Sequence, residues 1–354
     1  MKITDIDKNF IQQSSDDDTV WLDVKKSPFK IYGLLYDEED KIFRRIPKSI
    51  STQISQSVYI LSDDTAGGRL LFKTTSSSLS IKCVLPNYGP MPHMPITGSN
   101  GFSIYVDGKF YAKVSPACED FYTKDEYITY TAKVFIPNDG NFKEIKIYFP
   151  LYGRISQFFV GLESDCQLEK AKEYKYTRPV VYYGSSITQG GCASRPGNDY
   201  LAYIERWLDT DFINLGFSGS AKGELTMADY ISSLNPSIVV IDYDHNATTP
   251  KDLKETHYPF YKRIRNALPS TPIIFISRPD FYKNEQDSII RREVIKDTYL
   301  KSVKENDANT DFIDGQTLFG QEDYDSCTVD GCHPNDLGFY RMAKTIYPFI
   351  KKNI

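Results

Sequence analysis

The hydrophobic pattern of this 354-residue chain changes near residue 176. Before that point the apolar segments are short, aromatic and β-branched, as in Phe102–Val106 and Phe110–Val114, and turn residues separate them. Asp107-Gly108 between these two segments is a strong hairpin signal, and Asn138-Asp139-Gly140 marks another turn. Many short strands at this spacing predict an antiparallel β-sandwich, and helical periodicity is absent from this half.

After residue 177 the pattern alternates between strand and helix. Five strand-length apolar segments are separated by helical ones: Val180–Tyr183, Phe212–Leu215, Ile238–Ile241, Pro272–Ile276 and Phe312–Ile313. This alternation predicts a five-stranded parallel sheet covered by helices on both faces, which is a doubly wound, flavodoxin-like α/β domain. We therefore expect a β-sandwich domain over residues 1–176 and an α/β domain over residues 177–354, and the length of the chain also favours two domains.

Composition and charge exclude several classes of protein. The net charge is −5 and the 42 Lys and Arg residues form no long run, which argues against nucleic acid or an anionic membrane as a partner. No stretch approaches 18 apolar residues, so we expect no membrane insertion. The first residues show no apolar signal-peptide region, which leaves a cytoplasmic location or an exported protein with its leader removed. The sequence carries no signal for an oligomeric state.

Six cysteines are scattered along the chain without CxxC spacing. In a chain of this length they do not form a disulfide framework, although a pairing of Cys327 with Cys332 stays open. Both residues stand near His333, which suggests a metal site. However, the chain has only four histidines and no second Cys/His cluster supplies further ligands, so we expect no structural zinc.

Small and polar residues follow the ends of the strands expected in the α/β domain, where such sheets carry their functional sites. Ser186 follows the first strand, a suitable place for a nucleophile, although a helix-capping Ser explains it equally well. Gly219 follows the second strand and Asn246 the third, and both can offer N–H donors to a developing negative charge. A plain glycine-rich turn is the alternative for Gly219. Asp330 stands three residues before His333, where it can orient the imidazole or merely stabilise its own turn.

Taken in order, these segments resemble the SGNH (GDSL-type) hydrolases. GSSIT resembles the GDSIT block of that family, and FSG, the Asn after the third strand and DxxH match its second, third and fifth blocks. The resemblance implies that Ser186 is the nucleophile and that Asp330 and His333 are the acid and base of a catalytic triad. It also implies that Gly219 and Asn246 complete an oxyanion hole beside the Ser186 amide.

This sequence departs from the family pattern at two places. Ser185 stands where the family has the Asp of GDS, and the third block reads DYDHNA where GxND is common. The first half resembles the GxDLY-type β-domain that precedes the hydrolase in a bacterial branch of SGNH esterases, through segments 67–74, 91–95 and 101–105. Ser103 replaces the Asp of that motif.

The resemblance implies a serine esterase that works through an acyl-enzyme and needs no metal or cofactor. Its substrate would be a small-molecule or oligosaccharide ester, with deacetylation of a carbohydrate the favoured reaction. The alternatives are a lipase or thioesterase for longer acyl chains, and a non-catalytic carbohydrate-binding protein on the same fold.

Three further residues are candidates for substrate binding. Arg195 stands near the nucleophile loop and Arg278 ends the fourth strand, and a loop-stabilising role explains each equally well. The proline-rich loop at residues 87–98 is stiff enough to form one wall of a neighbouring cleft. We therefore expect Met91–Met94 to lie over the Ser186 site and His93 to touch the substrate or the catalytic loops. The alternative is that this loop seals the end of its own sandwich.

Overall fold

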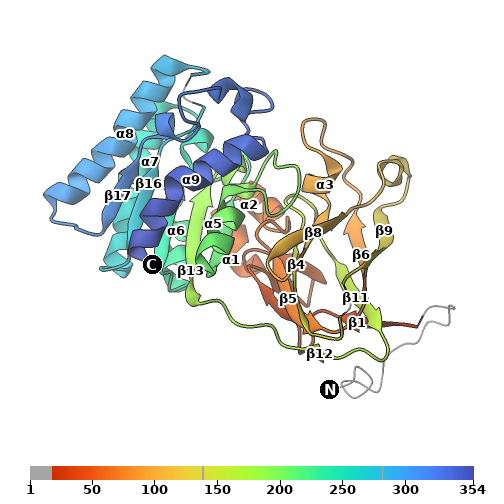
Figure 1. Ribbon diagram of the computed structural model, residues 1–354. Coiled ribbons are helices and arrows are strands. Elements are labelled where there is room, and N and C mark those ends of the chain that lie inside the picture. Colours follow the sequence, from red (N-terminus) through yellow and green to blue (C-terminus); the bar gives the residue numbers. More distant parts are fainter. Residues whose placement is uncertain (1–17, 138, 281) are drawn as a thin grey trace. The chain divides into compact units, whose positions relative to one another are not determined.

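The computed structural model describes residues 18–137, 139–280 and 282–354 of the chain (Figure 1). They form two compact units: the first comprises the described residues up to Arg45 together with Asp63–Glu173, and the second comprises Ile46–Ser62 and Tyr174–Ile354. Of the turn expected at residues 138–140, Asn138 lies outside the described residues, and Gly140 adopts a positive φ of 78°.

The first unit contains two antiparallel sheets, which confirms the predicted β-sandwich (Figure 1). The strand orders are β1-β11-β6-β9 and β12-β5-β10-β7-β8, with β2 also paired to β5 and a separate β3-β4 hairpin. The strands are β1 (Thr19–Asp23), β2 (Lys30–Tyr32), β3 (Leu35–Asp37), β4 (Ile42–Arg44), β5 (Arg69–Thr74), β6 (Ser78–Pro86), β7 (Phe102–Val106), β8 (Lys109–Val114), β9 (Tyr127–Phe135), β10 (Lys143–Tyr148), β11 (Gln157–Glu163) and β12 (Leu168–Glu169). Helix α3 (Ile96–Ser99) and the 3-10 helix η2 (Glu119–Tyr122) lie between strands.

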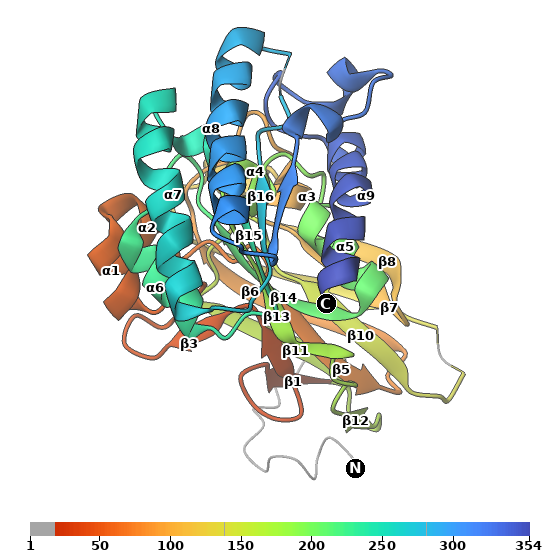
Figure 2. The same cartoon turned by 90° about the vertical axis from the view of Figure 1, so that its left-hand side faces the viewer.

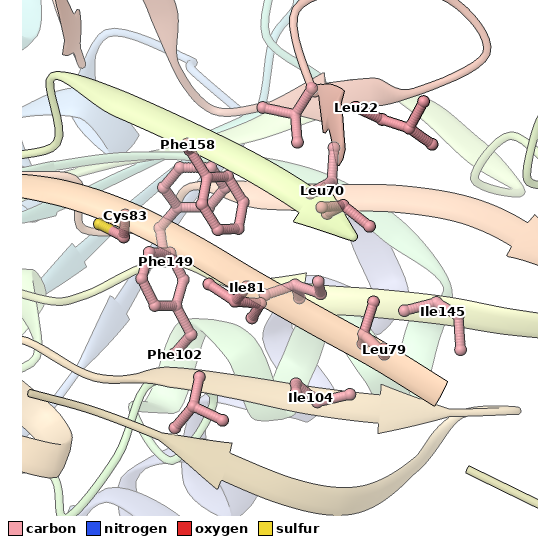
Figure 3. Packing of buried hydrophobic residues seen from close by; sticks show 14 of the residues in the cluster. Leu22, Leu70, Leu79, Ile81, Cys83, Phe102, Ile104, Ile145, Phe149 and Phe158 are labelled. Atoms are coloured by element: carbon pink, nitrogen blue, oxygen red, sulfur yellow. The ribbon is translucent and has the colours of Figure 1, made fainter. Parts of the chain in front are cut away.

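The core of the first unit lies between its two sheets (Figure 3). Phe158 of β11 and Phe102 of β7 come from different sheets, and their rings stack with centroids 4.7 Å apart. At the predicted hairpin between β7 and β8, Asp107 and Gly108 both have positive φ, of 48° and 76°. Positive φ at both central residues is typical of the tight turns that match the twist of an antiparallel pair.

Two short helices lie within residues 46–62, in the half of the sequence that shows no helical periodicity. Helices α1 (Lys48–Ile54) and α2 (Gln56–Leu61) have seven and six residues, which is too short to show a periodic apolar face in the sequence. Ile46 and Val58 are fully buried in the core of the second unit. This segment therefore belongs to the second unit although it precedes the boundary expected at residues 176 and 177.

The second unit is built on a five-stranded parallel sheet of order β14-β13-β15-β16-β17. Its strands are β13 (Tyr176–Gly184), β14 (Thr210–Gly216), β15 (Ile238–Asp242), β16 (Ile273–Ile276) and β17 (Thr310–Ile313). Every predicted strand is present, and the order 2-1-3-4-5 confirms the doubly wound, flavodoxin-like fold. The carboxyl ends of these parallel strands share one edge of the sheet.

Helices cover both faces of this sheet (Figure 2). Helix α5 packs against α9 on one face, and α6, α7 and α8 pack side by side on the other. The helices are α4 (Ser186–Gln189), α5 (Tyr200–Leu208), α6 (Leu225–Ser233), α7 (Pro250–Ala267), α8 (Glu285–Lys304) and α9 (Asp336–Asn353), with 3-10 helices η3 (Asp244–Asn246), η4 (Gly315–Thr317) and η5 (Tyr324–Cys327). Within the described part of the chain, no helix has both the length and the apolar character needed to cross a membrane.

Candidate active site

The candidate nucleophile lies at the turn between β13 and α4. Ser186 is the first residue of α4, and the side chain of Ser185 accepts the backbone N–H of Ile187 at 3.2 Å. Ser185 therefore caps this helix, and the hydroxyl of Ser186 is left for other partners. Since Ser and Asp are about equally good at capping a helix, Ser185 keeps this cap where the family has Asp.

A glycine is required immediately before this turn. A Cβ on Gly184 would lie 2.0 Å from Oγ1 of Thr188 and 2.5 Å from the carbonyl oxygen of Asp242, so no side chain fits. The carboxylate of Asp242 accepts hydrogen bonds from the hydroxyls of Thr188 and Tyr200, each at 3.0 Å. These bonds tie α4 and α5 to the end of β15 and hold the nucleophile turn in place.

Asp242 is a positioning residue of the nucleophile turn that the sequence analysis missed. Burial raises the pKa of its carboxyl to about 7, although the hydrogen bonds from Tyr200 and Thr188 favour the charged form. Its position at the end of a central strand is the signal that could have revealed it.

The structure brings Ser186, His333 and Asp330 together in one hydrogen-bonded chain. Oγ of Ser186 lies 2.9 Å from Nε2 of His333, and Nδ1 of His333 lies 2.8 Å from Oδ2 of Asp330. With the Nδ1 proton donated to the carboxylate, Nε2 presents its lone pair to the serine hydroxyl. This is the geometry of a nucleophile, a base and an orienting acid.

Asp330 also organises its own turn, so both interpretations of this residue apply. Its Oδ1 accepts the backbone N–H groups of Cys332 at 2.9 Å and His333 at 2.7 Å. Burial would raise the pKa of Asp330, but the hydrogen bonds from His333 and the two backbone amides outweigh it and lower the pKa to about 2. The carboxylate therefore stays charged beside the imidazole at neutral pH.

The two predicted oxyanion donors lie in neighbouring loops of the second unit. The side-chain amide of Asn246 is buried and donates one N–H to the carbonyl oxygen of Phe217 at 2.8 Å. A primary amide carries two N–H groups, so this bond fixes Asn246 while leaving a second donor. Gly219 is exposed in the turn that begins at Phe217 and has a φ of +66°, a conformation that favours glycine. The role of both residues in an oxyanion hole stays a prediction.

The loop after α4 is anchored to the start of the last helix. The carboxylate of Asp336 accepts the backbone N–H of Ser194 and the side-chain amide of Asn198, both at 2.8 Å. Asp336 lies three residues after His333, so this network joins the nucleophile loop to the histidine loop. Arg195 lies within the anchored loop, and its role in substrate binding stays a prediction.

Arg278 has well-defined contacts within the protein. Its guanidinium donates to Oγ of Ser288 at 2.8 and 3.1 Å and pairs with Asp287 at 2.8 Å. These bonds join the end of β16 to the start of α8, which favours the loop-stabilising interpretation. His93 is exposed in the first unit, and its expected contact with the Ser186 site stays a prediction. The six cysteines are free, so Cys327 and Cys332 do not form a disulfide.

The sequence matches two family models. Residues 177–351 match the GDSL-like lipase/acylhydrolase family, and residues 19–168 match the GxDLY domain, described as the N-terminus of SGNH-hydrolase-type esterases. Among curated proteins, none matches this chain significantly.

Solved structures share this fold over nearly the whole chain. A protein from Bacteroides ovatus, described as a GDSL-like lipase, is 28% identical with a TM-score of 0.82, and the match covers 94% of this chain and 97% of that one. A salicylyl acyltransferase from a tetracycline biosynthetic pathway is 20% identical with a TM-score of 0.77, over 96% and 98% of the two chains. A family two carbohydrate esterase from Cellvibrio japonicus is 10% identical with a TM-score of 0.63, over 94% and 97%.

Proposed function

Since the chain belongs to the GDSL-like lipase and acylhydrolase family and is an esterase, we propose that it cleaves its substrate through an acyl-enzyme on Ser186. The observation that carries this proposal is the continuous hydrogen-bonded chain from Ser186 through His333 to Asp330. A serine hydroxyl is a weak nucleophile until a neighbouring base removes its proton. Here Nε2 of His333 is within reach of that proton.

The reaction then proceeds in two steps. As Oγ of Ser186 attacks the ester carbonyl, Nε2 of His333 takes the hydroxyl proton and returns it to the departing alcohol. Asp330 supports the imidazolium that forms in between. The negative charge on the carbonyl oxygen is stabilised by the backbone N–H groups of Ser186 and Gly219 and by the amide of Asn246. Water, activated by His333, then releases the acid from Ser186.

We further propose that the substrate is a short acyl ester, such as an acetyl group on a carbohydrate. The shared fold with a family two carbohydrate esterase supports this choice. A lipase or thioesterase activity on longer acyl chains is the alternative, supported by the Bacteroides ovatus protein that is described as a GDSL-like lipase. The rates on p-nitrophenyl esters from acetate to octanoate, followed by acetate release from acetylated xylan, distinguish the two.

A fluorophosphonate probe tests the nucleophile directly. The wild-type protein should be labelled and should hydrolyse p-nitrophenyl acetate, and Ser186→Ala should lose both properties while unfolding at an unchanged temperature. Ser233→Ala, at an exposed serine near the end of α6, is the matched control and should behave as wild type. Near-normal turnover by folded Ser186→Ala would show that the mechanism is wrong.

A further inference from the structure

Three side chains that the proposed mechanism does not use meet at the same edge of the sheet as the triad. His245 follows β15, Asp280 follows β16, and Cys332 lies in the turn between Asp330 and His333. Each offers one ligand atom, and the three atoms lie within 4.8 Å of one another. They come from three separate loops of the second unit.

The contacts inside this cluster are incomplete. Nε2 of His245 and Oδ1 of Asp280 lie 2.9 Å apart, as an ion pair that is not aligned as a hydrogen bond. Both atoms are buried and have no hydrogen-bond partner among the described residues. Nδ1 of the same ring is 3.9 Å from Sγ of Cys332. Oδ1 of Asp280 also lies 3.7 Å from Nε of Arg278. Since buried polar atoms in native proteins are almost always hydrogen-bonded, the lack of an aligned hydrogen bond at both atoms leaves a place for a further ligand between them.

The chemistry of the donors indicates which partner fits. Imidazole nitrogen, thiolate sulfur and carboxylate oxygen are the three ligand types that Zn²⁺ uses in proteins. The sulfur donor argues against Mg²⁺ and Ca²⁺, which take oxygen ligands. Three protein ligands leave a fourth position for water. Asp280 also lines a cavity of about 290 Å³, together with Tyr282 and Gly331.

We propose that His245, Asp280 and Cys332 bind a Zn²⁺ ion, and that this ion inhibits the esterase by displacing the turn that holds Asp330 and His333. On binding, Zn²⁺ takes the place of the proton shared between His245 and Asp280 and of the thiol proton of Cys332, and both protons are released to solvent.

The inhibition follows from the spacing of the ligands. Nitrogen and sulfur ligands of a tetrahedral zinc ion lie about 3.5 Å apart, at Zn–N and Zn–S distances of about 2.0 and 2.3 Å. One zinc ion binds only one imidazole nitrogen, here Nε2 beside Asp280, whereas the thiol of Cys332 lies 3.9 Å from Nδ1 of the same ring. Binding must therefore move Cys332 toward Nε2. The backbone N–H of Cys332 donates to Asp330, and the next residue is His333. A shift of Cys332 therefore disturbs the hydrogen bonds that position the catalytic base.

Binding is tested with Co²⁺ on the full chain after removal of bound metals, because Co²⁺ reports thiolate ligation by a charge-transfer band in the near ultraviolet. We expect this band in the wild-type protein and in Cys118→Ser, a control at an exposed cysteine of the first unit. Cys332→Ser should lose the band. His245→Gln and Asp280→Asn should weaken Co²⁺ binding by at least about 10-fold, since even partners outside the ligand shell cost that much. A wild-type protein without the band, or Cys332→Ser with it, overturns the proposed site.

Inhibition is tested by the hydrolysis of p-nitrophenyl acetate with increasing Zn²⁺, each variant being compared with its own rate without metal. The Zn²⁺ concentration that halves the wild-type rate should leave folded Cys332→Ser, and likewise Asp280→Asn, largely uninhibited. Equal inhibition of all three proteins means that Zn²⁺ acts directly on His333 and overturns the proposed inhibition. The inhibition rests on the proposed esterase mechanism, whereas binding does not. Should the wild-type protein lack turnover altogether, the Co²⁺ titration still decides whether the site exists.

Discussion

Replacing the buried Asp242 with Asn should change how the stability of the second unit depends on pH. The carboxyl of Asp242 has a pKa of about 7 in the folded protein, raised by burial from an ordinary value of 3.8. Between about pH 4 and 7 the unfolded chain has lost this proton while the folded protein still holds it. Because the unfolded state binds fewer protons, the free energy of unfolding falls as the pH rises through this window.

The size of the effect follows from the shift. About three pKa units at about 1.4 kcal/mol each correspond to about 4 kcal/mol of stability that the wild-type protein loses between pH 4 and pH 8. The amide that Asp242→Asn introduces cannot ionise, and its oxygen can still accept from Thr188 and Tyr200. The stability of Asp242→Asn relative to wild type should therefore rise by about 4 kcal/mol across this range. At pH 4 the free energy of unfolding of the variant should be equal to that of the wild type or slightly lower, because the NH₂ group of the new amide needs a buried hydrogen-bond acceptor.

Urea unfolding measured at several pH values checks this prediction. The fluorescence of Trp207 on α5 reports the second unit when Trp21 of β1 is replaced by Phe in every protein compared. Asp297→Asn, at an exposed aspartate of α8, is the control and should follow the wild-type curve. A stability difference between Asp242→Asn and wild type that does not vary with pH would refute the assigned pKa and its cause.

Four other substitutions test the site. His333→Ala should lower kcat by several powers of ten, which corresponds to about 4 kcal/mol or more of lost transition-state stabilisation. The loss should be larger than for Asp330→Ala, because the imidazole performs both proton transfers. Steady-state kinetics that show the opposite ranking would contradict these roles. Asn246→Ala should lower kcat about 100-fold with little change in KM, and a change confined to KM would make Asn246 a substrate ligand. Gly184→Ala should lower the melting temperature, because its Cβ would overlap the carbonyl oxygen of Asp242, and an unchanged melting temperature would show that the turn can relax.

The fold of the second unit could be predicted because its sheet is buried on both faces. Strands such as Ile238–Asp242 are then continuous apolar runs, and the helices between them are long enough to show a period. Ser186 could be predicted as a site residue because residues at the carboxyl ends of parallel strands meet at one edge. Asp330 and His333 lie beyond the end of β17, and His333 is 147 positions from Ser186, so their place in the triad was predicted from the DxxH pattern and the family resemblance.

Other parts of the site depend on contacts that no local pattern encodes. Asp336 binds Ser194 and Asn198 across 142 and 138 positions, and each residue by itself looks like an ordinary helix-end or loop residue. The same holds for His245 and Cys332, which the sequence separates by 87 positions. The sequence shows no second Cys/His cluster, and the two donors proposed to join Cys332 stand singly in two other loops.

The early helices α1 and α2 limit how this protein can be divided. A fragment covering only residues 177–354 would lack Ile46 and Val58, which lie in the interior of the second unit beside residues such as Ile231. The apolar surface left uncovered would favour aggregation of such a fragment. During synthesis, the same segment leaves the ribosome long before the strands of its own unit. Its apolar side chains therefore cannot be buried in the core of the second unit until more than a hundred further residues have been synthesised.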